Sequence, residues 1–245
     1  MKTPSVEELF EAGGHLGHRK DKTDASMHPY IFRIQNRISI INLDKTAVQL
    51  TEALEYIKDL ATHGKTILFV GSKNPEMAEI IKKSALESKM PYVTERWIGG
   101  LLTNFKNIKK TIDHIKKLEG GRERKEFESY TKKERMNIDK EIDEGNRIFG
   151  GIKEMVNLPD AMIVFDTNNA IIAVKEAGTL QIPVIGINDM RFQKKLIAKF
   201  IPINDESKNA TKLLAETFAA VVKDAKAEGP PPQGRTQRVL GKKEK

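Results

Sequence analysis

The sequence predicts an α/β protein: a parallel sheet with helices on both faces, interrupted by an inserted helical hairpin. Short apolar runs recur with helical segments between them, as in strands that are buried on both faces of a parallel sheet. The interruption is the highly charged stretch 104–148, whose sparse apolar residues form narrow stripes suited to pairing two helices. A disordered charged insert is the alternative interpretation of that stretch.

The region before the alternation is less regular. It predicts a short helix at 4–12, then a polar loop, and then a β-hairpin over 30–43 with its turn at Gln35-Asn36. Asp44 or Thr46 is expected to cap the next helix. The alternating region then supplies strands at 66–70, 91–94, 161–165, 183–187 and 199–203 and helices at 75–88, 104–118, 168–178 and 207–226.

Composition limits the class of protein. The chain has 245 residues and no cysteine, which excludes disulfides and zinc–thiolate sites and suits a reducing cytosol. The N-terminus carries acidic residues and lacks the apolar core of a signal peptide. No stretch approaches the ~20 apolar residues of a membrane span. We therefore expect a cytoplasmic protein that does not enter a membrane.

The net charge of +8 is concentrated in two places. Residues 65–118 carry 11 basic against 5 acidic residues, and residues 229–245 carry 5 against 1. Localised positive charge predicts an anionic partner. The expected domains are a sheet domain formed by 1–103 and 149–228, a helical hairpin at 104–148, and a disordered basic tail at 229–245, which is rich in proline and glycine.

Residues 90–110 carry the most informative combination of side chains. A short strand breaks at Gly99-Gly100, beside Arg96 and the only tryptophan, Trp97, and then restarts as a basic helix. Cations can hold phosphates and a flat ring can stack on a base, so this stretch suits a polyanion. A core position for Trp97 is equally compatible with the sequence. The lysines of the helix are Lys106, Lys109 and Lys110.

Catalytic and metal motifs are weak. The turn after the 66–70 strand, GSKNPE, matches neither a dinucleotide nor a P-loop pattern, although Lys73 beside a helix start could hold one phosphate. Asp166 follows a strand, where helix capping is the simpler interpretation. His15 and His18 have metal-pair spacing, but few residues could complete a site, so hydrogen-bonded loop histidines are expected. We expect no cofactor, no metal and no enzymatic activity.

Six segments, in order, resemble the ribosomal protein S2 family in its bacterial or organellar form. They are LFEAGGHLGH (9–18), PYIFRIQNRISIINLDKT (29–46), TILFVGSK (66–73), PYVTERWIGGLLTNFKNIKK (91–110), GGIKEMVNLPDAMIVFDTN (150–168) and KEAGTLQIPVIGIND (175–189). Two segments depart from the family pattern. RKDKTDASMHP (19–29) replaces a segment containing Trp-Asn-Pro, and the stretch after 183–187 adds Arg191, Lys194 and Lys195.

The resemblance implies a flavodoxin-like, three-layer α/β/α domain with a protruding coiled-coil hairpin. It also implies a non-catalytic protein that binds small-subunit ribosomal RNA between the head and the body of the subunit. Neighbouring small-subunit proteins are the implied protein partners, with ribosomal protein S1 among them where the organism has one. The expected RNA-binding residues are Arg96, Trp97, Asn104, Lys106, Lys109 and Lys110, with Lys73, Arg33 and Arg37 as a second group.

Two other function classes remain compatible with the residues alone. One is a nucleotide-dependent α/β enzyme that uses the Gly71 turn and Asp166. The other is an adaptor that docks a second protein through the helical hairpin.

Overall fold

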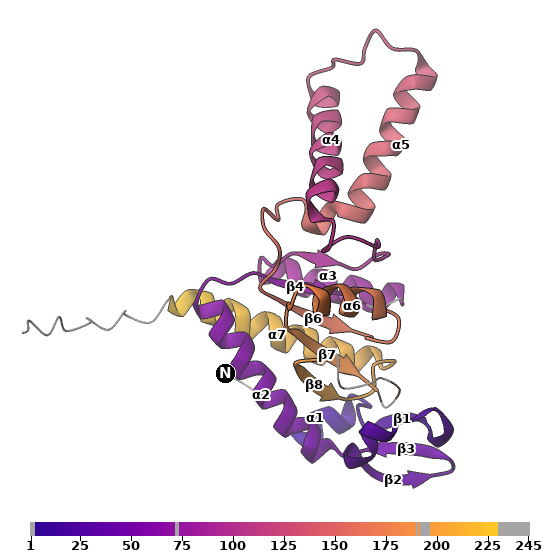
Figure 1. Cartoon of the computed structure of the whole chain (residues 1–245), viewed down its shortest axis with the longest axis vertical. Coiled ribbons are helices and arrows are strands. Elements are labelled where there is room, and N and C mark those ends of the chain that lie inside the picture. The colour runs from indigo at the N-terminus through magenta and orange to yellow at the C-terminus, as the bar shows by residue number, and fades with distance from the viewer. Residues whose placement is uncertain (1–2, 72–73, 190, 192–196, 230–245) are drawn as a thin grey trace, which may run out of the picture.

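The structure, a computed structural model, describes residues 3–71, 74–189, 191 and 197–229. Its centre is a five-stranded parallel sheet (Figure 1). The strand order is β5-β4-β6-β7-β8, which confirms the predicted fold class. Lys73 and nearly all of the predicted tail lie outside the described residues. The strands are β4 (Ile67–Val70), β5 (Tyr92–Val93), β6 (Ala161–Phe165), β7 (Val184–Asn188) and β8 (Lys199–Pro202).

Each central strand is apolar because both of its faces are covered. In β4, Ile67 and Phe69 belong to the core on one face of the sheet, and Leu68 and Val70 belong to the core on the other. Successive side chains of a strand point to opposite faces, so a continuous apolar run fills two cores at once. For this reason the predicted strand boundaries agree with the observed ones to within about one residue.

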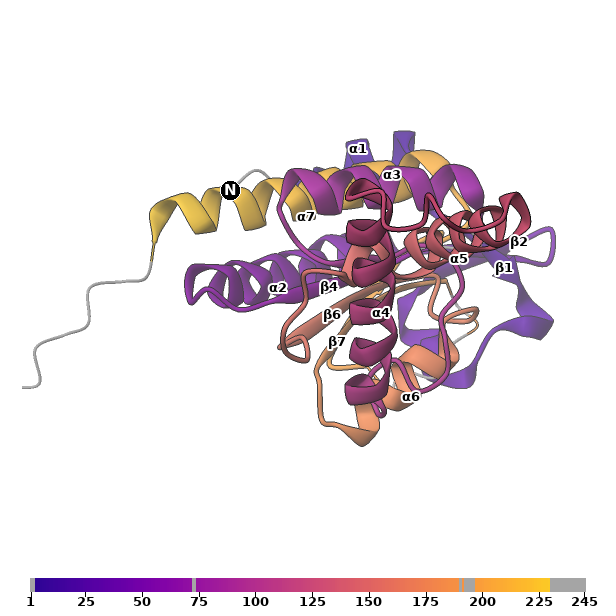
Figure 2. The ribbon, with the colours of Figure 1, turned by 90° about the horizontal axis from the view of Figure 1, so that it is seen from above.

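Helices cover both faces of the sheet (Figure 2). The first face carries α2 (Leu43–Thr62), α3 (Pro75–Glu87) and α7 (Lys208–Glu228), whose apolar residues share a core with β4, β6, β7 and β8. The second face carries α6 (Ile171–Thr179) and the base of the helical pair. No helix in the described part of the chain is long and apolar enough to cross a membrane.

A second, antiparallel sheet lies at the opposite end of the molecule from the helical pair (Figure 1). Its strand order is β1-β3-β2. The predicted polar loop contains β1, which pairs through its backbone with β3 although its side chains show no alternation. That pairing is non-local, so periodicity could not reveal it. The elements here are α1 (Val6–Glu11), β1 (Leu16–Arg19), η1 (Lys20–Lys22), η2 (Ala25–Tyr30), β2 (Ile31–Gln35) and β3 (Ile38–Ile41).

The hairpin turn and the cap of α2 both differ from the prediction. The turn residues are Asn36 and Arg37, with φ of 49° and 65°. Positive φ at both central positions is the hallmark of a type I′ turn, whose twist matches that of the strands. The cap of α2 is Asn42, whose side chain accepts from the Lys45 N–H. The predicted cap Thr46 instead donates its hydroxyl to the Pro202 carbonyl oxygen at 2.6 Å and so ties α2 to β8.

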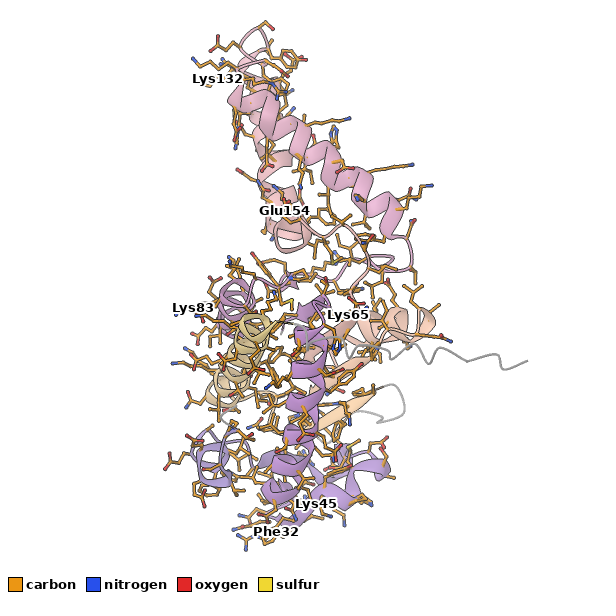
Figure 3. The ribbon with its side chains drawn as sticks, turned by 90° about the vertical axis from the view of Figure 1, so that its left-hand side faces the viewer. Phe32, Lys45, Lys65, Lys83, Lys132 and Glu154 are labelled. Atoms are coloured by element: carbon orange, nitrogen blue, oxygen red, sulfur yellow. The ribbon has the colours of Figure 1, made fainter. Side chains whose placement is uncertain are left out.

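The inserted segment forms two helices, α4 (Phe105–Glu123) and α5 (Lys132–Phe149), which we call the arm. The first helix was predicted to end at residue 118, but α4 continues through Gly120 and Gly121 to Glu123. The turn falls later, because Thr131 and Glu134 form a capping box that starts α5. Figure 3 shows Lys132 at the far end of the arm and Phe32 of β2 at the other end of the molecule. The domain boundaries stay predictions.

The arm joins the sheet through close contact between Gly151 and Tyr92. Gly151 lies in the short 3₁₀ helix η3 (Gly150–Ile152) after α5, and Tyr92 is in β5. A Cβ atom at Gly151 would lie 2.1 Å from the Tyr92 carbonyl oxygen, whereas one at Gly150 would meet nothing within 4 Å. Only glycine therefore fits at 151.

We expect Gly151→Ala to lower the free energy of unfolding by about 1–3 kcal/mol, because the added methyl group displaces the backbone of β5. Gly150→Ala is the matched control and should be neutral or slightly stabilising, since alanine favours a helical backbone. Urea unfolding followed by circular dichroism measures both. Equal stabilities of the two variants would contradict the proposed steric constraint.

Candidate nucleic-acid interface

The loop between β5 and α4 is held by one buried carboxylate. Glu176 of α6 is 8% exposed and lies under this loop. Its Oε1 accepts from the Gly100 N–H at 2.7 Å and from the indole Nε1–H of Trp97 at 3.2 Å. Its Oε2 accepts from the Leu102 N–H at 3.0 Å, and from the N–H and the hydroxyl of Thr103 at 3.2 and 3.3 Å. Five donors therefore converge on one side chain.

The pKa of Glu176 reflects two opposing effects. Burial acts to raise the pKa of this carboxyl, but the N–H groups of Gly100, Leu102 and Thr103 and the indole of Trp97 outweigh burial. The net result is a pKa below the ordinary value. Hydrogen bonds that favour the ionised form have this effect. The loop is thus organised around a negative charge that stays ionised at neutral pH.

Trp97 combines the two roles that the sequence left open. Its side chain is half-buried and packs against the core that also contains Leu101 and Leu102. The same side chain lines a cleft on the surface, next to the exposed Arg96. The bond from its indole Nε1–H to Glu176 fixes the ring in place. Contact between Trp97 and RNA stays a prediction.

The first two turns of α4 present the predicted lysines. Lys106 and Lys110 are exposed and have no ion-pair partner among the described residues. Lys109 faces differently, since its Nζ donates to the Val156 carbonyl oxygen at 3.4 Å. Asn104 occupies the N-cap position, but its side chain makes no capping hydrogen bond. Lys106 and Lys110 therefore lie on one exposed face of α4, whereas Lys109 points toward Val156.

These cations lie at the wrong end of a helix for helix stability. The N-terminus of a helix carries partial positive charge and favours acidic side chains. The first turn of α4 contains no acidic residue, and the helix starts without a side-chain cap. Its lysines therefore add to the positive potential of the helix dipole instead of offsetting it. An anion bound there would offset the charge of the lysines and the positive end of the helix dipole.

The second predicted group lies far from the first. Arg33 and Arg37 are exposed on the β2–β3 hairpin, at the end of the molecule away from the arm (Figure 1). Arg33 lines a groove of about 540 Å³ whose wall includes the exposed aromatic residues Phe10 and Phe32. The hairpin arginines and the lysines of α4 therefore belong to two separate surfaces, not to one patch.

A separate polar cluster lies at the carboxyl ends of β6, β7 and β8. The guanidinium of Arg191 contacts Asp189 (Nε to Oδ2, 2.5 Å), Asp205 (Nη2 to Oδ1, 3.5 Å) and Glu206 (Nη2 to Oε1, 3.2 Å). His18 of β1 lies 3.6 Å from the Asp189 carboxylate. Arg191 thus turns inward, and its closest partner is the buried carboxylate of Asp189.

Asp166 does not cap a helix, contrary to the prediction. Its carboxylate accepts from the backbone N–H of Asn169 at 3.2 Å and from the side-chain amide of Asn169, which tightens the turn before α6. The N-cap residue of α6 is Ala170, and no side chain caps that helix. The backbone of Asp166 has φ of 62°, a conformation in which its side chain reaches forward to this turn.

Asp205 is the buried acid with the largest perturbation. Burial, and then the charges of Asp189 and Asp166, raise the pKa of Asp205 to about 8 despite the attraction of Arg191. Asp189 is the closer partner of that arginine, which explains why Arg191 does not keep Asp205 ionised. At neutral pH Asp205 is therefore mainly protonated in the folded protein.

His15 and His18, whose spacing would suit a metal pair, do not meet in a metal-like arrangement, and the buried Nδ1 of His15 lacks the predicted hydrogen bond. His15 stacks on Phe10, with ring centroids 4.2 Å apart, whereas His18 faces Asp189 and Glu206. Among the described residues no group of three or more His, Cys, Asp or Glu side chains could hold a metal ion. Both histidines serve contacts within the antiparallel sheet and its neighbours.

Sequence reasoning missed two residues that shape these sites. Glu176 looks like any surface glutamate of a helix, and its role depends on a loop more than seventy positions earlier in the chain. The only local signal is its place in the apolar helix α6, between the buried residues Val174 and Ala177. Arg191 was noted as an added cation, but its inward orientation depends on Asp205, which is brought close by β8.

Glu176→Gln should destabilise the protein by about 2–3 kcal/mol, because its amide nitrogen would face N–H donors that now meet an oxygen. The sign of the pH dependence follows from the lowered pKa. The ionised form contributes stability above the unfolded pKa and loses it as pH falls through the folded pKa. The difference from the unchanged protein should therefore shrink in acid. Fluorescence of Trp97, the only tryptophan, reports on the loop during urea unfolding.

The matched control is Glu87→Gln, which alters an exposed helical carboxylate 4.0 Å from Lys83. It should change the free energy of unfolding by less than about 0.5 kcal/mol. Indistinguishable unfolding curves for Glu176→Gln and Glu87→Gln would show that the loop does not depend on this carboxylate.

Asp205→Asn should flatten the dependence of stability on pH between about pH 5 and 8. In that range the folded state retains a proton that the unfolded state has released, so stability falls as pH rises, by up to about 1.4 kcal/mol per pH unit from this group. Asparagine removes the linkage, and the variant should gain stability relative to the parent at alkaline pH. Unfolding free energies measured from pH 5 to 9 test this, and parallel curves would exclude it.

Comparison with families of known proteins gave one finding. A family model described as ribosomal protein S2 matches residues 9–225, which is most of the chain.

Proposed function

Since this chain belongs to the ribosomal protein S2 family and is therefore a structural protein of the small ribosomal subunit, we propose that it binds small-subunit ribosomal RNA through the start of the arm. The proposed contact surface consists of Arg96 and Trp97 in the loop and the first turns of α4. Its α4 residues are Asn104, Lys106, Lys109 and Lys110.

The observation that carries this proposal is the unpaired positive charge at the start of α4. Lys106 and Lys110 are four residues apart on one exposed face, and repulsion between them makes the free helix less stable. The helix dipole adds to that cost. RNA phosphates would relieve both effects. Such contacts position a protein on RNA but carry no base specificity.

Arg33 and Arg37 support a second, separate contact. Arg37 occupies a turn position with φ of 65°, where a glycine would be less strained, so stability alone does not favour arginine there. With the two surfaces at opposite ends of the body, one protein would bridge two sections of RNA. Lys73, which was grouped with these arginines, lies outside the described residues and stays a sequence-based prediction.

The remaining features of the proposal rest on the family. They are a non-catalytic role, a position between the head and the body of the subunit in the cytoplasm, and contacts with neighbouring small-subunit proteins. Docking of ribosomal protein S1, where the organism has one, belongs with these. The nearest alternative is a nucleotide-dependent enzyme, and α4 favours RNA because Lys106 and Lys110 do not line the cleft at the carboxyl ends of the strands.

The test replaces Lys106 and Lys110 by glutamate in the full chain and measures binding to purified small-subunit RNA at several salt concentrations. Losing two phosphate contacts should weaken binding and flatten the slope of log K against log[salt] by roughly 1.4–1.8 units. Glutamate at position 106, in the first turn, is favoured by the helix dipole, and position 110 is exposed, so we expect the double variant to stay folded.

Lys223→Glu, which reverses an exposed lysine of α7, is the control and should leave the slope unchanged. Sedimentation of lysates that carry each variant shows whether the protein and ribosomal protein S1 still migrate with the small subunit. Unaltered affinity and unaltered slope in the double variant would refute the α4 surface.

A further inference from the structure

The cleft that Arg96 and Trp97 line lies where the order of the parallel sheet reverses. From β4 the chain passes to β5 on one side, whereas from β6 it passes to β7 on the other. The helices after the two central strands, α3 and α6, therefore cover opposite faces, which opens a crevice outside the carboxyl ends of these strands. Ligands of open α/β sheets bind in such crevices. Here the cleft has a volume of about 810 Å³.

The wall of the cleft combines three kinds of side chain. Three cations line it from three elements: Lys82 of α3, Arg96 of the loop and Arg147 of α5. The aromatic side chains of Tyr92 and Trp97 and the apolar side chain of Ile172 form another part. Amide groups complete the wall. The amides belong to Asn146 and Asn169. Cations suit a phosphate, flat and apolar surfaces suit a base, and amides suit the polar edges of a base.

The positive charge of the cleft is accessible. Two acids also line it, but Glu79 pairs with Lys82 at 3.4 Å, and Glu95 lies 3.9 Å from Arg147. Both side chains of the second pair are exposed, Arg147 by 62% and Glu95 by 48%, so this ion pair contributes little free energy. A phosphate can therefore replace Glu95 as the partner of Arg147. Arg96 has no ion-pair partner among the described residues and leaves a net positive charge.

The start of α6 borders the cleft. Asn169, Ala170 and Ile172 line it, and no side chain caps the helix there, although the Asp166 carboxylate accepts from Asn169 in the preceding turn. The start of α3, by contrast, is capped by the side chain of Asn74. The aromatic wall is also preorganised, because the bond from Trp97 to Glu176 holds the indole before any ligand arrives. A fixed ring loses little conformational entropy on binding.

We propose that this cleft binds a single nucleotide, with its phosphate between Arg96, Arg147 and the start of α6 and its base against Trp97 and Ile172. The nucleotide is either an unpaired residue of an RNA strand, in which case the inference rests on the proposed function, or a free mononucleotide. Both sources present the same phosphate and base. The cleft adds a pocket for one residue to a surface that otherwise contacts only phosphates.

Trp97 makes the inference directly measurable, because it is the only tryptophan in the chain. The full-length protein is titrated with AMP, adenosine, inorganic phosphate and a short unstructured oligoadenylate while tryptophan fluorescence is recorded. Stacking of a base on the indole should quench the emission in a saturable way. Adenosine should bind about tenfold more weakly than AMP, since it lacks the charge-assisted contacts, and phosphate alone should compete without quenching.

Ile172→Glu is the informative variant, because it places a carboxylate at the edge of the cleft on a side chain that is already 53% exposed. It should remove the quenching. Leu86→Glu of α3 is the matched control, since Leu86 is 56% exposed and does not line the cleft. Quenching that persists in Ile172→Glu, or that is absent with both AMP and oligoadenylate in the unchanged protein, would overturn the proposal.

The different ligands distinguish a free nucleotide from a residue within RNA. The variants distinguish the cleft from the proposed α4 surface. Quenching by AMP supports a free nucleotide, whereas quenching by the oligonucleotide alone supports a residue within RNA. The double variant of Lys106 and Lys110 should keep the response to AMP while it loses affinity for ribosomal RNA. An unchanged affinity for ribosomal RNA in that variant, together with intact quenching by AMP, would refute the α4 surface and leave the cleft standing.

Discussion

The hydrogen bonds to the carboxylate of Glu176 are the interaction on which the candidate site depends. This carboxylate joins α6, which packs on the sheet, to the loop that carries Trp97 and leads into α4. Because its donors are mostly backbone N–H groups, it fixes the path of the chain as well as the side chains. The direction of the arm, the placement of the indole and the shape of the adjacent cleft all follow from this path.

The sheet was predictable because its physical signal is local. A strand buried on both faces must be apolar throughout, so β4, β6 and β7 appear in the sequence as short apolar runs. Elements defined by distant partners were not predictable. β1 exists through its pairing with β3, and the turn of the arm follows the capping box at Thr131, not the glycines before it.

The same distinction between local and non-local signals applies to the candidate site. The cations of α4 and Arg96 could be chosen from residue type and spacing, because exposed charge on a helix is a local property. The interaction partners of the basic side chains could not be predicted. Lys109 donates to the Val156 carbonyl oxygen, and Arg191 turns inward to buried acids. Whether a charge is free or satisfied depends on residues that only the fold brings near, and that difference separates a binding surface from a structural contact.

The arm also bears on how the chain reaches its fold. In the sheet, β4 lies between β5 and β6. β5 precedes the arm in the sequence but β6 follows it, so Val70 of β4 can pair with Val164 of β6 only after the arm has been synthesised. The contacts between α4 and α5 are close in sequence, and such helical hairpins form quickly. By returning the chain to its starting point, a formed arm shortens the loop that must close before β6 can insert. The arm that carries the proposed RNA surface is therefore also expected to bring the two halves of the sheet together during folding.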